Sequence, residues 1–177
     1  MALALSGFGY KGNEEAGRMR SLYISLCVAA ICLSAVPAAA AHGGALTGKA
    51  YAADGDTLVL AGKRIRLFGV DAFEHNQTCG RFKCGRRATS ALRDLLRGQA
   101  VTCVKQDSDR YGRIVAVCET ADGRDIGREM VRRGLAVAYR SFSGRYIADE
   151  NIAKSAGAGA WAYGFDSPLE YRKAHPR

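Results

Sequence analysis

Histidine and proline are scarce in this 177-residue chain, with three residues of each. No Ser/His/Asp set in the sequence indicates a hydrolytic triad. Residues 157–162 (GAGAWA) match a dinucleotide-binding pattern, but no predicted strand precedes them. The sequence therefore gives no support to triad hydrolysis or to dinucleotide chemistry.

A run of apolar residues long enough to span a bilayer is also lacking. Residues 22–36 are apolar, but they fall short of the roughly 20 residues that a membrane-spanning helix needs. The run follows two arginines and leads into PAAAA, which is the pattern of a secretory signal. We therefore predict that 1–41 is a leader and signal peptide, cleaved near Ala41. The mature protein is then secreted or periplasmic, with no stable membrane association, and a membrane anchor is the alternative.

Acidic residues are fewer than basic ones, with 17 Asp and Glu against 26 Lys and Arg. The predicted leader contains three basic and two acidic residues, so its removal lowers the formal net charge from +9 to +8. A basic surface speeds encounter with polyanions and gives sequence-independent affinity for phosphate. The charge favours DNA or RNA as a partner, although many exported proteins are basic for solubility alone.

Four of the six cysteines remain after removal of the predicted leader. On an exported chain, four cysteines usually form two disulfides. Three connectivities are possible, and the local pairs Cys79–Cys84 and Cys103–Cys118 fit best. The second pair lies at facing positions of a predicted hairpin, where the two side chains come close. A zinc site is the alternative, but the Cys79–Cys84 spacing is loose and the histidines are not placed to complete it.

Alternating apolar and polar residues predict short antiparallel strands at 48–53, 56–62, 63–71, about 100–105, 113–119 and 135–139. Helical spacing predicts helices at 86–97, near 125–133 and near 146–156. We expect an α+β fold, built as a small β-barrel with about three helices, in a single domain. The tail from Trp161 is expected to be packed at first and loose at its end.

Three separated segments carry carboxylates and arginines: DGDT at 54–57, RLFGVDAFE at 66–74 and DRYGR at 109–113. Carboxylates offer the hard oxygen ligands that calcium and magnesium prefer. Arginine offers a planar fork that fits two oxygens of a phosphate. The combination points to a divalent-metal site facing an anion clamp, and hence to cleavage of a phosphodiester.

These segments resemble the thermonuclease, or staphylococcal nuclease-like, family over roughly 47–163. The resemblance implies a five-stranded OB-type barrel and a calcium-dependent nuclease that hydrolyses DNA or RNA. We expect it to act with little sequence specificity, and a monomer is the default expectation. The remaining residues, 164–177, form a basic C-terminal tail.

The resemblance also assigns roles to individual positions. It implies that Asp56, Asp71 and the backbone carbonyl of Ala72 bind the metal. It implies that Arg66 and Arg113 bind phosphate and that Glu74 is the general base. By the same resemblance, the residues that border the nucleotide are Arg110, Tyr111 and Tyr139.

The chain departs from the family pattern at two positions. Phe73 stands where the family usually has proline, and we expect its ring to be buried instead. Ala72 lacks a hydroxyl, which does not remove a backbone ligand. These departures are the support for an alternative, a catalytically inactive OB-type nucleic-acid-binding module. A structural exported protein with a basic surface is a further possibility.

Two structural expectations follow from the residues themselves. Asp54 is expected to hydrogen-bond the turn before Asp56. Strict alternation puts Arg66 and Asp71 on opposite faces of one strand, because their spacing is odd. For both to serve one site the strand must twist sharply or bulge, and Gly69 is where we expect that.

Overall fold

The computed structural model describes residues 44–176. The predicted signal peptide and its cleavage position lie outside these residues. Along the described chain the elements are β1 (Leu46–Ala52), β2 (Thr57–Leu60), β3 (Lys63–Leu67), β4 (Val70–Ala72), α2 (Cys84–Leu96), β5 (Ala100–Ser108), β6 (Ile114–Thr120), α3 (Ile126–Arg132), β7 (Ala136–Ala138), α4 (Ile147–Ser155), the 3-10 helix η1 (Gly159–Ala162) and α5 (Pro168–Ala174).

Five strands form a closed barrel in the order β1-β2-β3-β6-β5. All neighbours are antiparallel except β3 and β6, which pair in parallel and close the barrel. Alternate residues of β3 show the two faces, since Ile65 and Leu67 point into the core while Arg64 and Arg66 face outward. The expected α+β barrel is therefore confirmed.

The strand at 136–138 lies outside the barrel. β7 pairs antiparallel with β4 in a separate two-stranded sheet. The predicted strand 63–71 is accordingly two strands, β3 and β4, separated by a turn at 68–69. This small second sheet holds Asp71 at the edge of the barrel.

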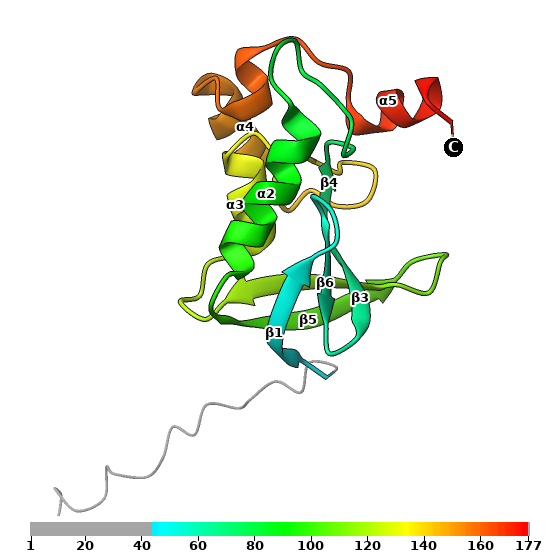
Figure 1. Ribbon diagram of the computed structural model, residues 1–177, viewed down its shortest axis with the longest axis vertical. Helices are drawn as coiled ribbons and strands as arrows, with labels where there is room; N and C mark the ends of the chain where they lie inside the picture. Colours follow the sequence, from blue (N-terminus) through cyan, green and yellow to red (C-terminus); the bar gives the residue numbers. More distant parts are fainter. Residues whose placement is uncertain (1–43, 177) are drawn as a thin grey trace, which may run out of the picture. The chain divides into compact units, whose positions relative to one another are not determined.

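Helices α2, α3 and α4 gather on one side of the barrel, and α2 and α3 run side by side (Figure 1). They confirm the three predicted helices. The apolar face of α2 includes Ala88, Leu92, Leu95 and Leu96, which join the barrel core. None of the helices within 44–176 is both long and apolar enough to cross a membrane.

The tail contains a further α-helix that was not expected from the sequence. α5 begins at Pro168, after a capping box in which Ser167 and Glu170 exchange side-chain and backbone hydrogen bonds. This arrangement satisfies the first free N–H groups of the helix. The end of the tail is therefore helical, where a loose segment was expected.

Both expected disulfides are present. Cys103 and Cys118 are directly paired on β5 and β6, with their Cα atoms 4.1 Å apart. Cys79 and Cys84 join the loop after β4 to the first residue of α2, with a Cα separation of 5.8 Å. The first bridge fastens the barrel, and the second fastens the loop that contains Glu74 to a helix.

Candidate active site

The turn between β1 and β2 places Asp56 at the edge of the barrel. The side chain of Asp54 accepts a hydrogen bond from the Asp56 N–H at 3.1 Å, as expected for an Asx-type turn. Asp56 itself is buried, with 8% of its surface exposed. One carboxylate oxygen accepts from the Thr57 hydroxyl at 3.0 Å, and the other lies 3.4 Å from the Ala72 N–H.

A turn at Gly69 brings Arg66 and Asp71 together. Gly69 has φ +71°, a left-handed conformation that glycine adopts without steric cost. The turn resets the alternation between β3 and β4, so that Arg66 Nη2 lies 3.2 Å from Asp71 Oδ1. The predicted position of the distortion is confirmed, although it is a turn between two strands and not a bulge.

Arg66 bridges the two buried aspartates. Its Nη1 lies 3.3 Å from Asp56 Oδ2, while its Nη2 contacts Asp71. Burial opposes the charge of Arg66, but the two carboxylates together raise its pKa. Burial, assisted by the charges of Asp54 and Asp71, also raises the pKa of Asp56 to about 6, although Arg66 and Thr57 work in the opposite direction. One guanidinium is therefore not enough to offset the cost of burying the Asp56 charge.

Arg172 of α5 is the second cation at the carboxylates, and it was not among the residues predicted from the sequence. Its guanidinium binds both oxygens of Asp71, at 3.0 and 2.9 Å. The same group donates to Glu74 Oε1 at 3.0 Å. It lies 101 residues after Asp71, in a segment without a site motif, so only the fold brings it here. Partial burial lowers the pKa of Arg172, but the contacts with Asp71 and Glu74 outweigh it and raise that pKa above the ordinary value for arginine.

Two buried groups hold the backbone around Glu74. The Glu74 N–H donates to Gln77 Oε1 at 3.1 Å, and Gln77 Nε2 donates to the backbone of Asp166 at 2.8 Å. Gly85, at the start of α2, packs so tightly that a Cβ there would lie 1.7 Å from the Glu74 carbonyl oxygen. The Glu74 side chain remains partly exposed, at 22%. The backbone at this position is thus held in place, and the partly exposed carboxylate lies against Arg172.

Arg113 approaches from the β5–β6 hairpin. Asp109 holds it, since Asp109 Oδ2 accepts from Arg113 Nε at 2.6 Å and Oδ1 accepts from the backbone N–H at 2.9 Å. The Nη1 group of Arg113 lies 3.5 Å from Thr57 Oγ1. Thr57 is therefore the link between Arg113 and Asp56, a role that its place in the DGDT segment could have indicated.

The three residues predicted to border the nucleotide divide into two groups. Tyr139 is half-buried beside the carboxylates, with the Arg66 guanidinium 5.7 Å from its ring centre. Tyr111 is 69% exposed at the hairpin tip, where Arg110 donates to its hydroxyl at 2.7 Å. Arg113 also lies over the Tyr111 ring at 5.7 Å. Arg110 and Tyr111 thus stand at the rim of the site.

Ala72 and Phe73 explain how the chain accommodates its departures from the family pattern. Ala72 packs against Gly55, where a Cβ on the glycine would lie 2.8 Å from the Ala72 methyl. Phe73 is 2% exposed and meets Phe165 edge to face, with ring centres 5.0 Å apart. The expected burial of Phe73 is confirmed, because a small second core formed with Cys79 and Cys84 encloses it.

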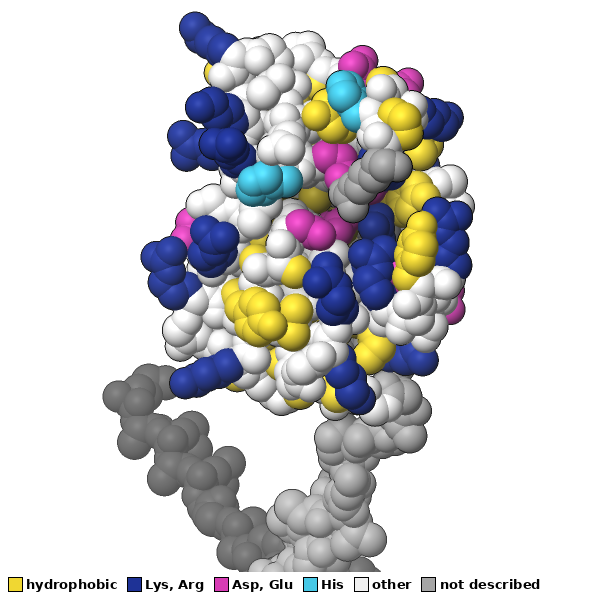
Figure 2. Space-filling model, turned by 45° about the vertical axis from the view of Figure 1, so that its right-hand side comes forward, with side chains coloured by type: hydrophobic (Ala, Val, Ile, Leu, Met, Phe, Trp, Pro, Cys, Tyr) yellow, Lys and Arg dark blue, Asp and Glu magenta, His cyan; other side chains and the backbone are white. Residues whose placement is uncertain are grey.

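A continuous set of contacts joins all five predicted functional side chains. It includes, in spatial order, Arg113, Thr57, Asp56, Arg66, Asp71, Arg172 and Glu74. On one face of the molecule, acidic side chains lie in the centre with lysine and arginine side chains around them (Figure 2).

The donor set fits a hard divalent cation. Asp56 and Asp71 offer carboxylate oxygens, and the raised pKa of Asp56 reflects a buried negative charge that a cation would stabilise. Within 44–176 no three His, Cys, Asp or Glu side chains cluster as metal ligands. The predicted set contains only two such side chains and a backbone carbonyl, so an ion there would keep several waters. Arg172 has to release Asp71 before both of its oxygens are open to a metal.

Comparison with known proteins identifies a matching family and several similar sequences. Residues 64–163 match the family described as staphylococcal nuclease homologue. The succinoglycan biosynthesis protein ExoI of Rhizobium meliloti (strain 1021) is 39% identical over 123 residues, covering 66% of this chain and 64% of that protein. An uncharacterized endonuclease of Escherichia coli is 32% identical over 115 residues, covering 62% and 72%. An uncharacterized endonuclease of Haemophilus influenzae is 32% identical over 124 residues, covering 66% and 65%. The chain thus spans between 64% and 72% of the length of these three relatives.

Proposed function

Because the chain belongs to the staphylococcal nuclease homologue family, we propose that it is a metal-dependent nuclease. It hydrolyses phosphodiester bonds of DNA or RNA with calcium and with little sequence specificity. The single observation that supports this most is the contact set that unites Asp56, Asp71 and Glu74 with Arg66 and Arg113. Relatives named as endonucleases agree with a phosphodiester as substrate.

Asp56, Asp71 and the Ala72 carbonyl would hold the calcium. Bound calcium supplies Lewis-acid polarisation of a phosphoryl oxygen. Among residues of the chain, Arg66 and Arg113 are placed on two sides of Asp56 and Thr57. Their charge would stabilise the extra negative charge on the phosphorus oxygens in the transition state.

Glu74 would act as the general base. It accepts a proton from the attacking water, whose oxygen forms the new bond to phosphorus while the bond to the leaving oxygen breaks and that oxygen takes up a proton from solvent. The Glu74 oxygen that now accepts from Arg172 then has to be released or shared. Tight packing against Gly85 fixes the backbone from which this carboxylate extends.

We also propose that the mature protein works in the periplasm or outside the cell. Two disulfides support an oxidising compartment. The predicted signal at 1–41 supports export. Extracytoplasmic calcium fills sites of modest affinity, which agrees with a site of only two carboxylates.

The test is degradation of single-stranded DNA and RNA by purified 42–177, with calcium and then with a chelator. Calcium-dependent cleavage is expected, and Glu74→Gln is expected to lower kcat by roughly 100-fold or more while calcium binding is retained. Lys173→Ala, which removes a charge from α5, serves as the control. Binding without cleavage in any divalent metal would favour the inactive OB-type module.

A further inference from the structure

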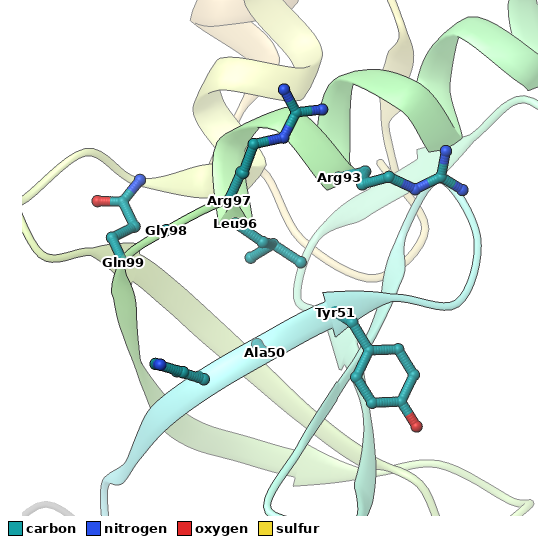
Figure 3. Close-up of a pocket in the computed structure, with 8 residues that line it drawn as sticks. Ala50, Tyr51, Arg93, Leu96, Arg97, Gly98 and Gln99 are labelled. Carbon is teal, nitrogen blue, oxygen red and sulfur yellow. The ribbon is translucent and has the colours of Figure 1, made fainter.

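A second basic region lies beside β1 and α2, away from the carboxylates. It is a groove of about 310 Å³ between β1 and the last turn of α2, and Figure 3 shows the residues that line it. Its walls contain Lys49 and Tyr51 from β1, Arg93 from α2, and Arg97 and Gln99 from the segment directly after α2. Among the described residues, none that line it is acidic. Tyr51 is 65% exposed, an unusual position for an aromatic ring of this size.

Three exposed arginines lie between the first turn of α2 and this groove. Arg86 and Arg93 are seven residues apart and so share one face of the helix, while Arg97 follows at the C-cap with extended backbone. At 1.5 Å per residue, Arg86 and Arg93 are roughly 10 Å apart along the helix axis. Arg86 is next to Gly85, which packs against the Glu74 carbonyl. The arginines therefore begin beside the backbone of Glu74 and end at the groove.

The outer face of the barrel provides the second side of the same path. Tyr51, Val59 and Arg64 are neighbours across β1, β2 and β3. The next outward pair along β2 and β3 is Thr57 and Arg66, both in the candidate active site. Two residues along a strand span about 7 Å, and adjacent strands lie about 4.8 Å apart. Tyr51 is thus within a few nucleotides of the site where the phosphodiester would be cleaved.

The charges in this region are available to a ligand. Within the described residues 44–176, Arg86 and Arg93 make no ion pair. Arg97 pairs with Asp94 at 2.5 Å, but both side chains are more than half exposed. An exposed pair of this kind contributes little to stability and is readily exchanged for a phosphate.

We propose that Arg86, Arg93 and Arg97, with Lys49 and Tyr51, form a track for single-stranded nucleic acid. This α2 track binds the part of the substrate that extends beyond the cleaved bond. The arginines contact the phosphates, and Tyr51 stacks on a base, which only an unpaired strand can offer. The inference rests on the proposed nuclease function and adds a preference for single-stranded substrates.

The test measures binding of fluorescein-labelled dT16 by anisotropy in chelator, so that cleavage plays no part. Arg93→Ala is expected to weaken binding about three- to tenfold. It should also reduce the slope of log affinity against log salt by about 0.7, as for one lost phosphate contact on a single strand. The matched control is Arg133→Ala, an exposed arginine at the end of α3, which is expected to leave the salt slope unchanged.

The role of Tyr51 is tested by a pair of variants. Tyr51→Ala is expected to weaken dT16 binding about fivefold or more, whereas Tyr51→Phe retains it because the ring still stacks. Calcium-dependent cleavage of the dinucleotide TpT should be unaffected by Arg93→Ala, since TpT is too short to reach the track. Thermal melting verifies that each variant is folded.

If Arg93→Ala bound dT16 with the affinity and the salt slope of the wild type, the proposed α2 track would be overturned. The single-stranded preference would be overturned if Arg93→Ala lost equal affinity for dT16 and for a 16-base-pair duplex while Tyr51→Ala bound dT16 as the wild type does. Failure of the wild type to cleave dT16 with calcium would overturn the proposed function, while the binding measurements in chelator would still decide whether the track exists.

Discussion

Asp56 carries its charge at a buried position where Asp54 and Asp71 are also close. Burial raises the pKa of its carboxyl to about 6 in the folded, metal-free protein, whereas an unfolded chain releases that proton near pH 4. Between these values the folded state binds more protons than the unfolded state, so the free energy of unfolding falls as pH rises. Ionised Asp56 therefore destabilises the metal-free fold above about pH 6.

Asp56→Asn is accordingly expected to stabilise the metal-free protein at pH 7 by about 1–3 kcal/mol. The measurement is urea unfolding in chelator from pH 4 to pH 7.5, taken as the difference between variant and wild type. That difference should grow over pH 4 to 6 and then level off. Asp94→Asn, at an exposed position, is the control. A difference that shrinks with rising pH would contradict the assignment.

Gly85 is the residue whose size matters most to the position of Glu74. A methyl group there would lie 1.7 Å from the Glu74 carbonyl oxygen and 2.9 Å from the backbone of His75. Because backbone atoms cannot move aside cheaply, Gly85→Ala is expected to destabilise the protein by about 2–4 kcal/mol. Urea unfolding measures the loss.

Ser90→Ala on the same helix is the control for Gly85→Ala. Ser90 is exposed, and a surface substitution of this kind changes stability by no more than about 0.5 kcal/mol. A similar small effect from Gly85→Ala would show that α2 can shift without cost, contrary to the contact seen here.

At the scale of elements, α5 places Arg172 against the carboxylates. Arg172 occupies both oxygens of Asp71 and one of Glu74. Its removal takes away a competing cation, so Arg172→Ala is expected to bind calcium about five- to tenfold more tightly, as for the loss of a charged hydrogen-bond partner. Calorimetric titration of calcium without substrate measures this.

Lys173→Ala is the matched control, since it removes the same charge from the next residue of α5 and Lys173 does not contact Asp71 or Glu74 in any ion pair of the described residues. It should leave the calcium affinity close to that of the wild type. Equal affinities for wild type and Arg172→Ala would mean that the metal and Arg172 do not compete.

The sequence predicted those parts of the site that follow from local patterns. Alternation located the barrel strands, and the odd spacing of Arg66 and Asp71 required the distortion found at Gly69. Arg172 could not be predicted, because its contacts depend on how the tail returns to the barrel. The capping box from Ser167 to Glu170 was a readable helix signal, but it does not indicate which surface the helix contacts.

At the scale of the whole molecule, the two disulfides stabilise different regions. Cys103–Cys118 closes a loop with a sequence separation of 15, and Cys79–Cys84 one of 5. In the chain-entropy model these contribute about 3 and 2 kcal/mol. Replacing both cysteines of Cys103–Cys118 with serine is therefore expected to lower stability more than replacing both cysteines of Cys79–Cys84. Urea unfolding of the oxidised proteins measures the difference.

The two pairs of variants should differ in their effect on cleavage. Loss of Cys79–Cys84 frees the loop between Glu74 and α2, so it should lower activity more than it lowers stability. Loss of Cys103–Cys118 should lower stability and leave kcat nearly unchanged at low temperature. Equal loss of kcat in both pairs would contradict this division.

The parallel pairing of β3 with β6 closes the barrel, and it also determines when the site comes into existence. Arg66 lies on β3, and Arg113 directly precedes β6, so the two arginines stay apart until strands separated by about fifty residues meet. Contacts so distant in the chain are slow to form. During refolding, cleavage should therefore return only after β3 and β6 have paired, so the recovery of activity would report on the formation of this one long-range contact.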